Sequence, residues 1–289
     1  MQPFPIPVRS LMPEPTDAVA YMPMPREMNT FEMPRLPEPG PDTDANDVLG
    51  ARDVLDAFLG HMQTWLDAGG ELPALDLASL PAGVLRVLNE TLGEGEVSAI
   101  VEAGHEIRVQ ETVFSGVWRQ QHIQGTQLMH DFLLAAPIPP VVGALAAERA
   151  APQLRSLPLP PGAMNVPALV NELQEAMDRS GPETPAHVIN LTLLPLSPED
   201  AAHLDALLDG GSVVVLSRGF GNCRISSTAA RNVWRVQYFN NMQTLILNTI
   251  EVATMPAVAL AAREDLLETH GRLADLVQWM GDSVSPAAA

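Results

Sequence analysis

The first strong pattern of apolar and polar positions along the chain is helical. Apolar side chains recur three and four residues apart between Asp47 and Asp67, and Gly69 and Gly70 follow. This spacing places the apolar side chains on one face of a helix, and a glycine pair is a common helix stop. We therefore predict an amphipathic helix from Asp47 to about Asp67. Its apolar positions are Val48, Leu55, Phe58, Leu59, Met62 and Leu66.

Strand patterns dominate the C-terminal part of the chain. The segment from His187 to Leu196 alternates and is rich in β-branched residues, which predicts a strand. The next four residues, Ser197 to Asp200, combine a serine cap, a first-turn proline and two acids, so a helix should begin there. Three strand regions follow, of which the second is interrupted: residues 212–217, 223–239 and 244–252. A helix from about Pro256 to Met280 closes the segment.

Comparing the chain with itself at an offset of 116 residues indicates a duplication. Eight of the 28 ungapped positions from residue 92 to residue 119 are identical, where unrelated sequences would share about two. We predict a repeated unit of roughly 100 residues. Each unit has the order β-α-β-β-β-α, which predicts an α+β fold with antiparallel sheets and helices on one face. The identical pairs include Arg108 with Arg224, Trp118 with Trp234, and Arg119 with Arg235.

The repeat divides the chain into four parts. Residues 1–45 form an extended arm that we expect to be disordered, because the first 41 residues hold eleven of the 27 prolines and proline resists helix and sheet. A first unit with its leading helix follows at residues 46–149. Residues 150–186 form a proline-rich linker with a short helix, and the second unit covers residues 187–289. Whether the two units share one sheet or form separate lobes stays open.

The arm also concentrates adaptable apolar side chains. Its first 41 residues hold six of the 13 methionines, which is more than a solvated spacer needs. Two interpretations stay open: the arm packs on its own domain, or it is a short docking element for a partner protein. The candidate docking residues are Tyr21, Met22, Met24, Arg26, Met28 and Phe31.

The charge balance excludes several classes of function. The chain has 16 basic and 35 acidic residues, so the net charge is 16 − 35 = −19, and we expect no nucleic-acid binding. All the basic residues are arginine, which excludes P-loop and Schiff-base chemistry because both need a lysine amine. No apolar run is long enough to span a membrane and the start does not resemble a secretory signal, so we expect a soluble, cytoplasmic protein.

A run of arginines is the clearest candidate site outside the arm. Four arginines fall within residues 218–235, a stretch without any acid. Arginine binds carboxylates and carbonyls with a planar fork, and Gly219 and Gly221 would let another backbone approach closely. Either these arginines pair with the protein's own acids, or they bind a partner or an anion. The candidate binding residues are Arg218, Phe220, Asn222, Arg224, Arg231 and Arg235.

Catalytic and metal-binding patterns are incomplete. Cys223 is the only cysteine, and neighbouring arginines would lower its pKa, although its aligned counterpart Ile107 favours a buried structural role. The seven histidines show neither HxxxH nor HxH spacing. The glycine run at Gly219 fails the dinucleotide fingerprint because Arg224 stands where the last glycine is needed. We therefore expect no enzyme activity, no cofactor and no resident metal.

Three segments resemble the HupH/HyaF family of hydrogenase expression and formation proteins, whose members include HoxQ. They are HVINLTLLPLSPED from His187, the long segment from Val213 to Val252, and PAVALAAREDL from Pro256. The arm segment YMPMPREMNTF and the first-unit segment IRVQETVFSGVWR are similar to other family segments. Residues that carry the resemblance are Glu111, Trp118, Arg119, Arg218, Gly219, Gly221, Asn222, Cys223, Arg224, Asn232, Trp234, Gln237 and Asn248.

The resemblance implies a cytoplasmic, non-catalytic maturation chaperone for nickel-iron hydrogenase. Its expected partner is the precursor of the iron-sulfur small subunit, bound before export with its twin-arginine signal peptide, and a second hydrogenase accessory protein is a further candidate partner. The acidic surface would attract a basic export signal. Two alternatives stay open: an iron-sulfur or redox handling protein with Cys223 as a ligand, and an enzyme that uses the arginines to hold an anionic substrate.

Overall fold

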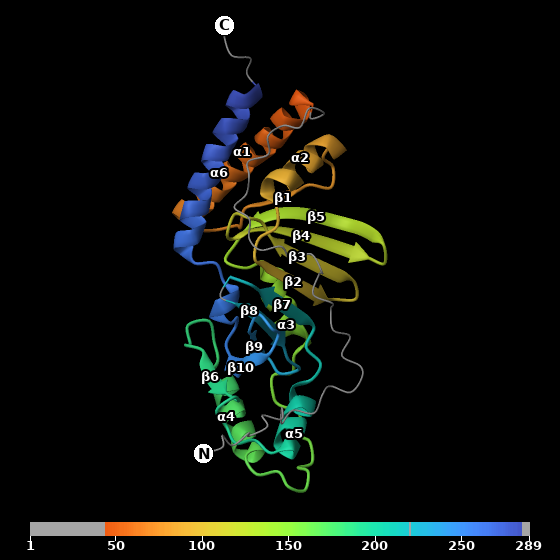
Figure 1. The fold of residues 1–289 in the computed structure, drawn as a ribbon, viewed down its shortest axis with the longest axis vertical. Coiled ribbons are helices and arrows are strands. Elements are labelled where there is room, and N and C mark those ends of the chain that lie inside the picture. Colours follow the sequence, from red (N-terminus) through yellow and green to blue (C-terminus); the bar gives the residue numbers. More distant parts are fainter. Residues whose placement is uncertain (1–43, 220, 285–289) are drawn as a thin grey trace, which may run out of the picture.

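The computed structural model describes residues 44–219 and 221–284. Within these ranges the chain forms six α-helices, one short 3-10 helix and ten strands, and the strands build one open antiparallel sheet. The sheet runs through the molecule, with helices gathered towards its two ends (Figure 1). The α+β class predicted from the sequence is therefore confirmed. The Pro/Met-rich arm, including Tyr21 to Phe31, lies outside the described residues.

The first half of the sheet follows one long helix. This helix, α1, runs from Ala45 to Ala68, as its apolar periodicity predicts, and Asp44 caps it by accepting from the amide of Asn46 at 2.9 Å. The next elements are β1 (Ala74–Asp76), α2 (Ala82–Leu92), β2 (Val97–Glu102), β3 (Glu106–Glu111), β4 (Val117–Gln124), β5 (Gln127–Ala135) and α3 (Pro140–Arg149).

The second half repeats this order after one intervening helix, α4 (Val166–Arg179). Its elements are β6 (His187–Asn190), α5 (Pro198–Leu208), β7 (Val213–Ser217), β8 (Asn222–Ser227), β9 (Val233–Phe239), β10 (Leu245–Val252), the 3-10 helix η1 (Ala257–Ala259) and α6 (Arg263–Val284). The predicted capping box of α5 is present, with Ser197 and Asp200 each bonded to the other's backbone amide.

One continuous sheet joins the two halves, so they are not separate lobes. The strand order is β1-β5-β4-β3-β2-β7-β8-β9-β10-β6. The junction is the antiparallel pair of β2 and β7, in which Ala99 lies opposite Val215. These two residues are 116 positions apart, the offset of the sequence repeat. Corresponding strands lie at equal distances on either side of this junction, so the strand order of the second half is the reverse of that of the first.

The predicted strand count was wrong in each unit. Residues 223–239 form two antiparallel strands, β8 and β9, with Ser226 opposite Arg235. The turn between them is tight because Asn232 adopts a positive φ of 60°, a conformation that asparagine tolerates. Each half therefore has five strands, and from its first strand onwards the order is β-α-β-β-β-β-α.

Two predicted boundaries were also wrong. The strand expected to reach Leu196 ends at Asn190, whose side chain accepts from the amide of Thr192 at 3.0 Å and so starts a turn. The helix expected from Pro256 to Met280 is interrupted after η1 and begins again at Arg263. Asp265 accepts from the amide of Ala262 at 3.1 Å, which stabilises the new helix start.

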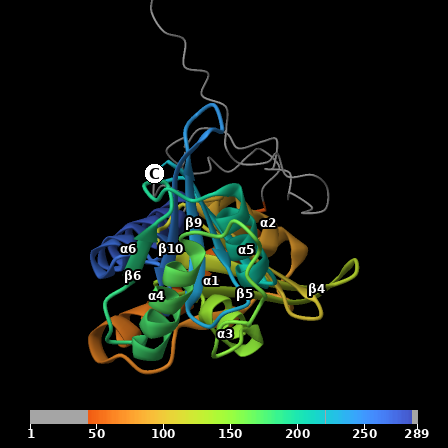
Figure 2. The same ribbon diagram turned by 90° about the horizontal axis from the view of Figure 1, so that it is seen from below.

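Helices cover both faces of the sheet, whereas one face was expected. Val117 and Leu133 pack with α1, α2 and α6, while Trp118 and Leu134, next to them in sequence, pack with α3. Neighbouring strand residues point to opposite faces, so α3 covers the face opposite to α1, α2 and α6. At the other end, α4 and α5 pack on Val233 and its neighbours. Figure 2, seen from below, shows α4 and α5 beside β9 and β10.

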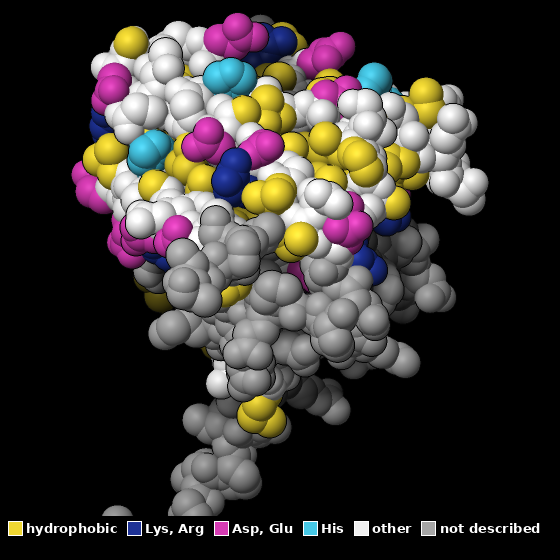
Figure 3. All heavy atoms as spheres, turned by 90° about the horizontal axis from the view of Figure 1, so that it is seen from above, with side chains coloured by type: hydrophobic (Ala, Val, Ile, Leu, Met, Phe, Trp, Pro, Cys, Tyr) yellow, Lys and Arg dark blue, Asp and Glu magenta, His cyan; other side chains and the backbone are white. Residues whose placement is uncertain are grey.

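The last helix, α6, packs against the first helix, α1. Leu266, Leu273, Leu276 and Met280 of α6 share one apolar core with α1, so the C-terminal helix packs on the first half. Seen from this end, acidic side chains are scattered among apolar ones and basic side chains are few (Figure 3). None of the helices in the described ranges combines the length and the apolar character that a membrane span requires.

Candidate functional site

The candidate site is a cavity of about 740 Å³ on the sheet face that also carries α5. Leu216, Arg224 and Arg235 all lie on this face. Leu216 is directly opposite Arg224 on the neighbouring strand. Arg235 is opposite Ser226, which lies two residues after Arg224 on β8 and therefore on the same face. The C-terminal end of α5 and the glycines after it form one wall. The lining includes Ile100, Glu102, Asp205, Asp209, Val214, Leu216, Arg218, Asn222, Arg224, Ser226 and Arg235.

Arg235 is held by the protein's own side chains. Its Nη1 forms an ion pair with Asp205 of α5, and its Nε donates to the amide oxygen of Asn248 at 3.1 Å. Asn248 is itself buried on β10. For this arginine the structure supports internal pairing, the first of the two roles considered from the sequence.

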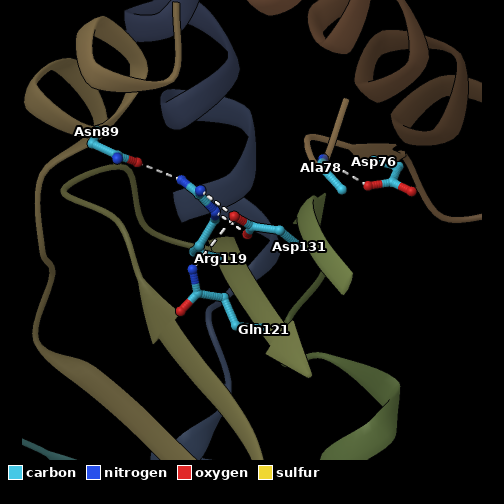
Figure 4. Close-up of polar contacts among 6 residues, drawn as sticks. All are labelled: Asp76, Ala78, Asn89, Arg119, Gln121 and Asp131. Atoms are coloured by element: carbon cyan, nitrogen blue, oxygen red, sulfur yellow. Dashed lines mark hydrogen bonds and ion pairs between the residues drawn. The ribbon is translucent and has the colours of Figure 1, made fainter. Parts of the chain in front are cut away.

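Arg119 occupies the matching place in the first half. Its Nη1 donates to the side-chain oxygen of Asn89 on α2 at 2.6 Å, and its other nitrogens bind the carboxylate of Asp131 on β5. Figure 4 shows the guanidinium between these two residues, with Gln121 beside it. Asn89 and Asp205 are also 116 positions apart. Both arginines therefore connect a sheet face to the helix that covers it.

Arg218 lies at the end of β7, at the rim of the cavity. Its backbone amide donates to the carbonyl of Glu96 at 3.2 Å. Burial lowers the pKa of the Arg218 guanidinium, while the nearby carboxylates of Glu94 and Glu96 act to raise it. Arg218 remains a cation at neutral pH, and its field is offset by these two acids.

Arg224 differs from the other arginines of the cavity. Its Nε is buried, and no acceptor for it exists among the described residues. No ion pair joins Arg224 to an acid within residues 44–219 and 221–284. An unsatisfied buried donor of this kind is unfavourable and is uncommon in folded proteins. The Arg224 guanidinium is therefore the group of the cavity that is best placed to bind another molecule.

The six predicted residues of the arginine stretch do not form one cluster. Arg218, Asn222, Arg224 and Arg235 line the cavity, and Phe220 lies outside the described residues. Arg231 is exposed in the turn at the opposite end of β8 and β9, where its amide donates to the carbonyl of Ala151 at 2.8 Å. The interpretation that the four arginines of residues 218–235 lie together is therefore wrong for Arg231. Arg231 lies in the turn between β8 and β9, whereas Arg218, Arg224 and Arg235 line the cavity.

Cys223 lies on the opposite face of β8, away from the arginines. It belongs to the apolar core around α3. Burial raises the pKa of its thiol to about 11, despite a hydrogen bond with Tyr238, whose own pKa burial raises to about 12. The neighbouring arginines do not lower this pKa, because adjacent residues of a strand point to opposite faces. A protonated, buried thiol is a poor nucleophile and a poor metal ligand.

Three histidines meet where sequence spacing showed no motif. The Nε2 of His105 lies 3.1 Å from the Nδ1 of His122, and the ring of His130 stands edge-on to that of His122 with centroids 5.7 Å apart. Strand pairing brings them together, since His122 faces His130 across β4 and β5. Within the described part of the chain, no group of three potential metal ligands has the geometry to hold an ion.

Several residues that carry the family resemblance have structural roles. The indoles of Trp118 and Trp234 donate to the carbonyls of Ala136 and Ala253 at 2.8 and 3.1 Å. The buried Glu111 accepts from the amide of Gly116 at 3.0 Å. Sequence reasoning missed the acceptors of the paired arginines, which are Asp205, Asn248, Asn89 and Asp131. The offset of 116 aligns Asn89 with Asp205 and Arg119 with Arg235, so it relates the two helix contacts to each other, but it does not predict either contact.

Comparison with known proteins gives one consistent family. The family model described as "HupH hydrogenase expression protein, C-terminal conserved region" matches twice, at residues 48–155 and 163–280. The chain is 40% identical over 288 residues to the hydrogenase expression/formation protein HoxQ of Cupriavidus necator, covering 97% of this chain and 99% of that protein. It is 40% identical to HupH of Rhodobacter capsulatus, covering 92% and 93%, and 34% identical to the hydrogenase-1 operon protein HyaF of Escherichia coli, covering 74% and 75%.

Proposed function

The chain belongs to the HupH family of hydrogenase expression proteins, and from this premise we propose that it is a maturation chaperone for nickel-iron hydrogenase. Its client is the precursor of the iron-sulfur small subunit, which it holds in the cytoplasm before export and assembly. The observation that carries the proposal is the cavity around Arg224, because this side chain is half-buried and its buried Nε has no acceptor among the described residues, which favours binding to a group of another protein. The family names support a role in hydrogenase formation.

We propose that the client contacts two parts of the chain. The first is the cavity face with Arg218, Asn222 and Arg224. The second is the arm segment of residues 21–31, whose methionines and aromatic residues suit a docking element. The net charge of −19 supports an attraction for the basic twin-arginine signal peptide. A second hydrogenase accessory protein is a further partner in this proposal.

In this proposal the protein has no catalytic role. The relatives are named as expression or formation proteins, and the raised pKa of the Cys223 thiol speaks against the alternative in which this cysteine ligates iron or sulfur carriers. For the two halves we propose an origin by duplication. It is supported by the sequence offset, by the two matches of one family model and by the reversed strand order about the β2–β7 junction.

Co-purification from the native host tests the function. The tagged full-length chain should capture the small-subunit precursor, identified by mass spectrometry. Arg224→Gln and deletion of residues 21–31 should each reduce capture by about ten-fold or more, as expected for loss of a charged contact or an anchor segment. Two variants serve as controls, Cys223→Ala and Arg108→Gln, and both should capture the precursor normally. Loss of capture with Cys223→Ala alone would instead favour metal ligation.

A further inference from the structure

We infer that Arg224 binds a carboxylate of the partner polypeptide, so that the cavity recognises an acidic side chain or a free chain end. This inference deepens the proposed function and depends on it for the identity of the partner. The chemistry of the bound group is argued from the cavity alone.

The first half of the sheet provides an internal comparison. Arg108 on β3 lies opposite Ile100, and Arg224 on β8 lies opposite Leu216, so the two arginines occupy the same register in the two halves. The Nε of Arg108 donates to the carboxylate of Glu106, two residues earlier on the same strand. The residue two positions before Arg224 is Asn222, which is neutral. The second half thus keeps the arginine and lacks the carboxylate.

The same atom is affected in both places. Nε is the nitrogen that Glu106 satisfies in Arg108, and Nε is the buried nitrogen of Arg224 for which none of the described residues supplies an acceptor. Arg224 is also less exposed, since it is half-buried while the side chain of Arg108 is 58% exposed. A missing carboxylate is therefore more unfavourable at Arg224 than it would be at Arg108.

The other acids of the cavity do not replace the missing group. Asp205 is engaged by Arg235. Glu102 is the last residue of β2 and lies beside the start of β7, away from Arg224, where its amide donates to the carbonyl of Ser212. Asp209 follows α5, and no hydrogen bond or ion pair connects it with Arg224 within the described ranges. These fixed negative charges disfavour a doubly charged phosphate and leave a singly charged carboxylate as the better match.

The surroundings of Arg224 fit a group that belongs to a polypeptide. Ile100, Val214 and Leu216 line the cavity and are half-buried, so they offer apolar contact to the carbon atoms that carry the carboxylate. Gln237 lies opposite Arg224 on β9, and Ser226 lies on the same face. A polar amide and a hydroxyl beside a cation suit the backbone next to a carboxylate.

Small probes on the isolated full-length protein test the inference without a client. N-acetyl-leucine represents a chain end, and N-acetyl-glutamic acid α-amide represents an acidic side chain. Their neutral counterparts are N-acetyl-leucinamide and N-acetyl-glutamine amide. The readout is the Nε–H resonance of Arg224 in a proton–nitrogen spectrum, assigned by its loss in Arg224→Gln. We expect at least one acidic probe to shift this resonance, and the identity of that probe distinguishes a chain end from a side chain.

Asn222→Glu supplies a carboxylate from the chain itself, as Glu106 does in the first half. It should move the Arg224 Nε–H resonance before any probe is added and weaken binding of the acidic probe by about ten-fold or more. The matched variant Asn46→Glu adds the same charge at an exposed position of α1 outside the cavity, and it should bind the probe like the unmodified chain. Equal shifts with acidic and neutral probes, no shift with any probe, or undiminished binding to Asn222→Glu would overturn the inference.

The co-purification and the probe experiment together distinguish a failure of the carboxylate site from a failure of the proposed function. A client that co-purifies and depends on Arg224, together with probes that fail, would keep the chaperone and reject the carboxylate. Probes that bind specifically, together with an absent client, would keep the carboxylate site and reject the proposed partner.

Discussion

Ala99 lies opposite Val215 at the centre of the sheet, in the pair of strands that joins its two halves. Val215 is fully buried in the core shared with Trp118 and Trp234. Because the sheet is continuous and α6 returns from the second half to pack on α1, we expect both halves to unfold together. Val215→Ala should lower the free energy of unfolding by about 2 kcal/mol.

Urea unfolding, which gives the free energy of unfolding, and hydrogen exchange in each half test this prediction. A single transition that moves to lower urea with an unchanged slope is expected, with faster exchange in both halves. Val188→Ala is the control, because Val188 is 52% exposed on the edge strand β6 and should change stability by less than about 0.5 kcal/mol. Two separate transitions in the unmodified chain would contradict a single cooperative unit.

Asp200 should make stability fall in acid. Burial acts to raise the pKa of this carboxyl, but hydrogen bonds from the amides of Val166, Asn165, Ser197 and Met164 outweigh burial and lower the pKa to about 2, from the ordinary 3.8. A folded pKa below the unfolded value means that the stabilisation is complete above the unfolded pKa. It is lost as the pH falls through the folded pKa.

The variant Asp200→Asn checks this contribution. It should cost about 2 kcal/mol at neutral pH, since the Asp200 carboxylate accepts from the amide of Val166 at the start of α4 and from the amide of Ser197 at the start of α5. Its melting temperature should depend less on pH between 4 and 2, the window set by the two pKa values. Glu199→Gln is the matched control in the same helix turn. An identical acid profile for Asp200→Asn and the unmodified chain would contradict the assignment.

Local patterns predicted the elements of this fold, and long-range pairing decided its arrangement. The periodicity from Asp47 and the cap at Ser197 predicted α1 and α5 because a helix is specified by neighbours along the chain. The division into β8 and β9 was missed because it depends on a positive φ at Asn232, a single residue in an otherwise strand-like run. The packing of α6 on α1 joins segments about 200 residues apart, and no local pattern encodes such a contact.

The site was predicted in part for the same reason. The sequence marked the arginine stretch, but only strand alternation and register show that Arg224 and Arg235 share a face while Cys223 points away. The acceptors of Arg235 come from α5 and β10, so charge counting could not assign them. The offset repeat carried more information than the charge run, because it relates each arginine to a counterpart with different partners.

Cys223 should react slowly with alkylating reagents in the folded protein. Burial raises the pKa of its thiol to about 11, from the ordinary 9.0, so the reactive thiolate is depleted about a hundred-fold at pH 8. Mass spectrometry after iodoacetamide treatment should show little modification of the native chain and full modification in denaturant. Fast labelling of the native chain at pH 8 would contradict the buried, protonated thiol.

The histidine group should weaken the fold as the pH falls below about 6.5. Burial lowers the pKa of His122, and the neighbouring His105 and His130 lower it further. Since the folded pKa lies below the unfolded value, the unfolded chain binds more protons in this range and stability decreases with falling pH. Thermal unfolding between pH 7.5 and pH 5, about the ordinary histidine pKa, should show a smaller decrease for His122→Gln. His61→Gln, at an exposed position of α1, is the control.

The ion pairs of the two equivalent arginines, Arg119 and Arg235, should differ in their contribution to stability. Asp131 and Arg119 are 4% and 15% exposed, so Asp131→Asn leaves a buried guanidinium without its carboxylate and should cost about 3 kcal/mol. Asp205 and Arg235 are 53% and 22% exposed, and Arg235 keeps its hydrogen bond to Asn248 when Asp205 is lost. Asp205→Asn should therefore cost less than about 1 kcal/mol.

The same pair of variants separates stability from binding. Asp205→Asn removes a negative charge from the cavity while the fold is largely preserved, so binding of the acidic probe should strengthen by about two- to five-fold, the range of a partly solvated charge interaction. Asp131→Asn lies outside the cavity and should leave probe binding unchanged in the folded fraction. Weaker probe binding after Asp205→Asn would mean that Asp205 positions Arg235 for the ligand, because loss of a merely repulsive charge can only strengthen an anion's binding.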